Sequence, residues 1–207
     1  MRACHSPLVT RHFFLIMDLQ RIHIKLLTDA PRTLDLEPFI EIFGRWRADK
    51  NHPVGWVDLA DYAHVPRGMG IVLVGFQANF AFDMSDPAPG ILYAAKKGLA
   101  GTHAERIASA MRACLELSRR LTGEKEFPPG VQLRTDALEI YFPDRLVTPN
   151  TNETDAELRP AVELAIGALY GASGAALTPQ KDTGLAYGFS IRVMNAEPLG
   201  SLLKRLG

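Results

Sequence analysis

The stretch 56–95 constrains the fold more than any other part of the sequence. Residues 78–84 alternate strictly between an apolar, largely aromatic face and a polar face, which is the period of a half-buried β-strand. Three neighbouring segments have the composition and bounding turns of strands: Trp56–Tyr62, Gly70–Gly75 and Ile91–Ala95. Because short links rich in proline and glycine join these four segments, the sequence predicts an antiparallel meander.

Helical patterns flank the meander, and residues 21–28 before it read as one more strand. In residues 36–49, apolar side chains recur at helical spacing and Asp35 stands where an N-cap is expected. After the meander, Thr102-His103-Ala104-Glu105 is a capping-box sequence that opens a helix of about 20 residues. The stop signal Phe127-Pro128-Pro129-Gly130 is the best boundary in the chain.

The C-terminal part repeats this order in outline. We expect strands at 131–135 and 137–142, a helix from a second capping box at Thr154 to Tyr170, a hairpin of 175–180 with 185–193, and a closing helix over 196–206. The prediction is therefore an α+β fold with antiparallel meanders and three to four helices. It divides into a disordered extension (1–17), an N-terminal half (18–126) and a C-terminal half (131–207), packed as one globular unit. The two halves are either a strand-helix-strands-helix pseudo-repeat or a simple recurrence of α+β elements.

The composition excludes several classes of protein. The 23 basic side chains equal the 23 acidic ones, whereas nucleic-acid binders and polybasic membrane-surface proteins need a basic excess. Neither a membrane span nor a clear secretory signal is present. The only cysteines, Cys4 and Cys114, make a disulfide framework improbable and favour a reducing cytoplasm. No metal or cofactor motif occurs, so we expect neither group.

The densest polar cluster lies at one end of the meander. Asp58, Asp61 and His64 stand within seven residues, with Tyr62 and Arg67 beside them. A histidine beside a carboxylate is suited to acid–base catalysis. The alternative is that Asp61 bonds to turn backbone and that His64 is a surface turn residue.

Two further places are candidates for ligand binding. Lys96 and Lys97 precede a glycine-containing loop and a helix N-terminus, a combination that favours anions, although ordinary helix capping explains it as well. Polar side chains of the meander, including Arg67, Gln77, Asn79 and Asp83, either line a pocket or form a solvated sheet face.

One block of sequence carries a resemblance. Residues 56–75 (WVDLADYAHVPRGMGIVLVG), supported by 131–151 and by Leu158-Arg159-Pro160, resemble a widespread bacterial protein family of unknown function. The likeness extends from about residue 21 onward. It implies a cytosolic α+β protein and brings no activity and no functional residues with it.

Three functions remain, in order of preference. The first is a non-enzymatic module that binds a small ligand or a partner protein. The second is a structural protein that self-associates into a homo-oligomer through apolar surface on the meander or the closing helix. The third is a small hydrolase- or isomerase-like enzyme that uses His64 with Asp58 or Asp61.

Overall fold

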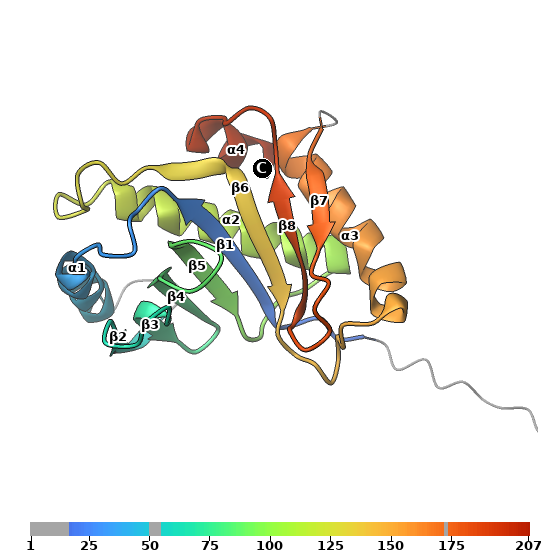
Figure 1. Cartoon of the computed structure of the whole chain (residues 1–207), viewed down its shortest axis with the longest axis horizontal. Helices are drawn as coiled ribbons and strands as arrows, with labels where there is room; N and C mark the ends of the chain where they lie inside the picture. The colour runs from blue at the N-terminus through green and yellow to red at the C-terminus, as the bar shows by residue number, and fades with distance from the viewer. Residues whose placement is uncertain (1–16, 50–54, 172–173) are drawn as a thin grey trace, which may run out of the picture.

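The computed structural model describes residues 17–49, 55–171 and 174–207, and folds them into one sheet and four helices (Figure 1). The elements follow one another as β1 (Ile22–Thr28), α1 (Glu37–Ala48), β2 (Trp56–Tyr62), β3 (Gly70–Gly75), β4 (Ala78–Asp83), β5 (Gly90–Ala95), α2 (His103–Thr122), β6 (Leu133–Phe142), α3 (Asn152–Tyr170), β7 (Ala176–Pro179), β8 (Tyr187–Arg192) and α4 (Leu199–Arg205).

The eight strands lie in the order β2-β3-β4-β5-β1-β6-β8-β7, and every neighbouring pair is antiparallel. The predicted α+β class and the meander of β2 to β5 are confirmed. The two halves of the chain meet at the centre of the sheet, where β1 pairs with β6. The pseudo-repeat of the halves stays a prediction.

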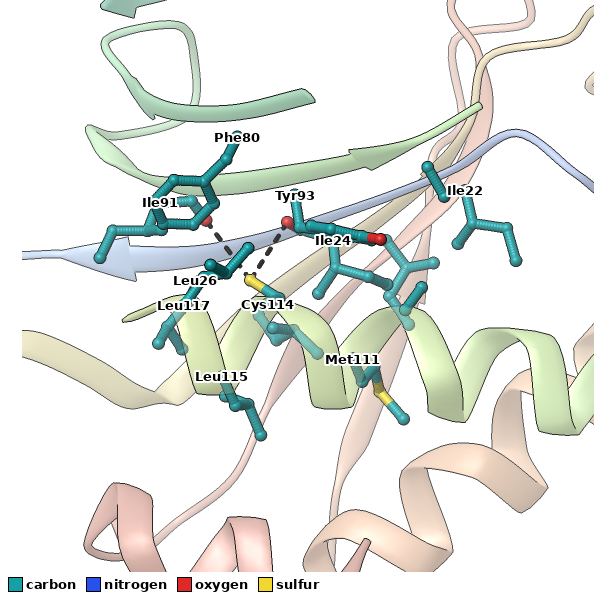
Figure 2. Close-up of a cluster of buried hydrophobic side chains, with 14 of the residues drawn as sticks. Ile22, Ile24, Leu26, Phe80, Ile91, Tyr93, Met111, Cys114, Leu115 and Leu117 are labelled. Atoms are coloured by element: carbon teal, nitrogen blue, oxygen red, sulfur yellow. Dashed lines mark hydrogen bonds between the residues drawn. The ribbon is translucent and has the colours of Figure 1, made fainter. Parts of the chain in front are cut away.

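The core fills one face of this sheet. Alternation along the strands sends Ile24 of β1 and Phe80 and Phe82 of β4 to that face. The Phe82 ring stacks on Phe39 of α1, with ring centroids 4.0 Å apart. Figure 2 shows α2 crossing β1 and β5, with Cys114 between them. The buried apolar residues of all four helices belong to this one cluster.

Element boundaries differ from the sequence-based expectation in the C-terminal half. The strands expected at 131–135 and 137–142 are one strand, because both parts pair with β1: Leu133 lies opposite Thr28 and Leu138 opposite Leu26, with an irregularity in the register between them. Helix α3 begins at Asn152, since Thr151 and not Thr154 is its N-cap. The closing helix is shorter than expected because Pro198 occupies its N-cap position and disfavours helix before it.

The N-terminal side differs from the expectation at the start of α1. Leu36, not Asp35, is the N-cap residue of α1, although the Asp35 carboxylate accepts the amide of Glu37 at 3.1 Å. The predicted disordered extension lies outside the described residues except for Met17, which packs against the core. In the described part of the chain, no helix is long and apolar enough to cross a membrane.

Candidate functional site

The sheet face opposite the helices, called here the open face, carries two ion pairs. Lys25 lies between the core residues of β1, so its side chain points the other way and meets Asp83 of β4, with Nζ and Oδ2 2.6 Å apart. Glu139 stands directly opposite Lys25 on β6, and its Oε1 lies 2.8 Å from Nη2 of Arg192 on β8. Four charges of alternating sign thus cross the sheet from β4 to β8.

Three of these four charges are enclosed within the chain, whereas Arg192 is 42% exposed. The side chains of Lys25, Asp83 and Glu139 are 1%, 2% and 3% exposed. Lys25 also donates to the Ser85 carbonyl at 2.9 Å, and the Ser190 hydroxyl donates to Glu139 at 2.5 Å. Buried charges are tolerated when they are paired and hydrogen-bonded in this way. Glu139 also lines a small cavity of about 120 Å³ beside β7.

Burial also decides the protonation of His23, the neighbour of Lys25 two residues earlier on the open face. Desolvation lowers the pKa of His23 to about 4, with the nearby Asp83 carboxylate opposing the shift. The imidazole is therefore neutral near pH 7. Burial likewise lowers the pKa of Lys25, while Asp83 raises it.

A separate concavity lies between α3 and the edge strand β7. A cavity of about 600 Å³ is bounded by the loop before α3, the first turns of α3 and the β7–β8 hairpin. A second cavity of about 380 Å³ continues it toward the end of α3, and Arg159 lines both. We call the two together the α3–β7 groove. Its walls are Glu153, Asp155, Arg159, Glu163 and Gly167 on the helix and Ala175, Leu177, Pro179 and Lys181 on the strand side.

Arg159 is held rigidly in the middle of the groove. Its Nε and Nη2 donate to the two carboxylate oxygens of Asp155 at 2.9 and 2.8 Å, and Asp155 also accepts from the Tyr187 hydroxyl at 3.0 Å. The guanidinium lies 5.0 Å from the ring centroid of Phe189. The bonds from Arg159 lower the pKa of Asp155, and burial raises that of Tyr187. The two parallel hydrogen bonds hold the Arg159 guanidinium in one orientation on the helical wall of the groove.

The strand side of the groove is a sheet edge. β7 is the last strand of the sheet and pairs only with β8 among the described strands. The backbone N–H of Gln180 donates to Gly188 of β8 at 2.9 Å. Since ladder bonds alternate along an antiparallel pair, Thr178 also bonds toward β8, and the backbone groups of Leu177 and Pro179 face outward.

The structure separates the predicted catalytic residues. Asp58 stands opposite Val74, which packs on the open face, whereas Asp61 is three residues further along β2 and so points to the other face. The carboxylate of Asp58 accepts the amide of Leu59, and that of Asp61 accepts the amide of Ala63. Within the described residues, no hydrogen bond or ion pair joins either carboxylate to His64. Their catalytic role stays a prediction that this geometry does not favour.

The predicted ligand-binding residues are distributed over three places. Asn79 and Asp83 lie on the open face, where the Oδ1 atom of Asn79 is buried without a hydrogen-bond partner and Asp83 is paired with Lys25. Arg67 reaches Asp86 across 3.3 Å at the surface.

Gln77, Lys96 and Lys97 meet at the turn before α2. The Gln77 carbonyl accepts the amides of both lysines, at 2.8 and 3.4 Å, and the Lys96 ammonium donates to the Gly75 carbonyl. The predicted capping box is present, and its Glu105 carboxylate accepts the amide of Thr102 at 2.7 Å. A carboxylate thus already lies at the helix N-terminus where an anion would bind. These binding roles also stay predictions.

Of the residues that form the groove and the open-face ion pairs, Asp83 alone was a candidate from the sequence. Asp155 and Arg159 do have the i, i+4 spacing of a helical ion pair. Lys25, Glu139 and Arg192 each interrupt an apolar strand pattern with a charge, which is the usual signal of a buried partner.

Comparisons with known proteins add no assignment. No protein-family model, no curated protein and no solved structure matches the chain. The resemblance to an uncharacterised bacterial family therefore remains an expectation. Within the described residues, no group of three or more His, Cys, Asp or Glu side chains could hold a metal ion.

Proposed function

We propose that this protein is a non-enzymatic binding module whose α3–β7 groove receives an extended segment of a partner protein. The observation that carries the proposal is the pair of adjoining cavities, of about 600 and 380 Å³, that share Arg159 and run beside an edge strand. A groove between a helix and a free strand edge matches a recurring mode of peptide recognition.

The length of the groove favours a peptide over a compact small molecule. Its helical wall extends from Glu153 to Gly167, which is about 21 Å at 1.5 Å per residue. An extended chain of roughly six residues covers that distance. Both polar and apolar groups line the groove, which suits the main chain and the mixed side chains of a peptide.

The charges of the groove are suited to binding and not to turnover. Asp155 and Arg159 neutralise each other through two hydrogen bonds, and Tyr187 is committed to Asp155. The pKa of Asp155 is lowered and that of Tyr187 is raised, so neither group exchanges a proton readily near neutral pH. Recognition of polar main-chain and side-chain groups is what the arrangement offers.

Peptide selection on the wild-type protein tests this function, with a variant whose groove is blocked as the control. Gly167 lines the second cavity, and a Cβ atom added there meets nothing within 4 Å, so Gly167→Phe fills the groove without a backbone clash. Gly44 on α1 is a matched control, since its added Cβ also meets nothing within 4 Å. Both substitutions remove a helical glycine, and both variants are expected to fold.

A displayed library of random octapeptides is selected on the wild-type protein, and enriched peptides are synthesised and titrated by fluorescence anisotropy. We expect Gly167→Phe to weaken binding at least tenfold, and Gly44→Phe to leave it unchanged. Enriched peptides that bind all three proteins equally, or a selection with no enrichment, would contradict the proposal.

The same proposal locates the protein in the cytoplasm, with neither nucleic acid nor membrane as partner. The support is the low cysteine content and the free thiol of the buried Cys114, together with the balanced charge.

A further inference from the structure

The geometry of β7 points to how the segment binds: we propose that it adds to the sheet as a ninth strand on the outer edge of β7. This inference rests on the proposed function and specifies the chemistry of the partner. The partner is recognised through its main chain, as an extended segment with unblocked backbone amides, and side-chain contacts come second.

The unpaired backbone groups of β7 define the pairing. Leu177 presents both its N–H and its C=O outward, because the ladder to β8 uses the groups of Ala176, Thr178 and Gln180. Pro179 also faces outward but has no N–H, so it contributes a carbonyl only. The added strand is therefore anchored at Leu177, with a weaker bond at Pro179, and its pairing ends at that proline.

The cavity between α3 and this edge determines which side chain of the partner is buried on binding. Leu177 lines the second cavity together with Ile166 and Gly167. Directly opposite residues of paired strands point to the same face, so the partner residue opposite Leu177 projects into that cavity. Gly167 has no side chain, and Ile166 is an apolar floor with 2% exposure. A bulky apolar side chain fits there.

The other edge of the sheet, β2, is less suited to the addition of a strand. β2 carries Asp58, 69% exposed, and the exposed Asp61, and charged side chains on an edge strand discourage the addition of another strand. Helix α1 packs against β2. Strand addition is thus favoured at β7.

Backbone methylation of the bound peptide tests strand addition. The probe is the most enriched octapeptide of the library described above, resynthesised as a series with one N-methylated amide in each member. A strand paired on one edge only uses every second N–H, so we expect losses of tenfold or more at the two alternate positions opposite Leu177 and Pro179. The intervening members should stay within about threefold of the parent peptide. A second readout is slowed hydrogen exchange of the Leu177 amide in the complex.

Failure of strand addition and failure of the binding groove give different results. Uniform losses or no losses along the methylated series, with Gly167→Phe still blocking the parent peptide, would overturn strand addition and leave the binding groove standing. A parent peptide unaffected by Gly167→Phe would overturn the groove as a binding site and this inference with it.

Discussion

Replacing Lys25 by methionine tests whether the open-face charges hold the sheet together. The substitution keeps an unbranched side chain that is one atom shorter and removes the partner of Asp83, which is 2% exposed. Leaving a buried charge without its partner costs about 3–5 kcal/mol. Asp83 retains the Ser85 hydroxyl at 2.6 Å and the Ser85 amide at 3.2 Å. We therefore expect a loss in unfolding free energy near the lower limit, about 3 kcal/mol.

Urea unfolding at pH 7 measures this loss. With a slope of about 2 kcal/mol per M, the midpoint should fall by about 1.5 M while the slope stays the same. The double variant Lys25→Met/Asp83→Asn removes the orphaned charge and keeps an acceptor for Ser85, so it should recover most of the loss. Arg21→Met is the control, because Arg21 is 62% exposed and lies 3.7 Å from Asp144; exposed pairs contribute about 0–1 kcal/mol.

Two results would refute this reasoning. One is a Lys25→Met variant that loses no more stability than Arg21→Met. The other is a double variant as unstable as Lys25→Met alone, which would mean that lost packing and not the unpaired carboxylate of Asp83 causes the effect.

Three further predictions concern single residues. The pKa of His23 is about 4 in the folded state against 6.5 for the free side chain, so between these values the unfolded state binds the proton more strongly. Lowering the pH from 7 to 5 should therefore reduce the free energy of unfolding by about 2 kcal/mol through this group. In urea titrations, the His23→Gln variant should lose correspondingly less stability over the same pH range. Cys114 is fully buried and burial raises the pKa of its thiol to about 12, so in a Cys4→Ser background Ellman's reagent should react only as fast as the protein opens; rapid labelling in the native state would show that the core is accessible. A Cβ on Gly90 would lie 2.6 Å from the Leu26 carbonyl and 3.0 Å from Cε of Lys25, so Gly90→Ala should lower stability by about 1–3 kcal/mol, and an unchanged thermal midpoint would disprove that close approach.

The sequence predicted the elements well wherever local chemistry decides them. The capping box at Thr102 and Glu105 and the aromatic face of β4 are both confirmed, because hydrogen bonds and periodicity over a few residues determine them. The start of α3 was wrong by three residues, since Thr151 and Thr154 are both competent N-caps and only the fold selects between them.

The site was much harder to predict, because it depends on segments distant in sequence. The α3–β7 groove brings Asn150, Arg159 and Lys181 together, and nothing in their local sequence shows which sheet edge lies beside α3. The Lys25–Asp83 pair crosses β5, which lies between β1 and β4 in the sheet. Asp83 was a candidate for its charge within a strand, but its partner could not be named without the strand order.

The pairing of β1 with β6 has a consequence for synthesis of the chain. Ile24 pairs with Ile140, 116 positions later, so one edge of β1 has no neighbour until the second half has left the ribosome. A nascent chain ending after α2 would offer that edge, with its apolar face, to any other exposed strand. Truncated products of this length should thus depend on chaperones and aggregate readily, even though each of their helices and hairpins can form locally.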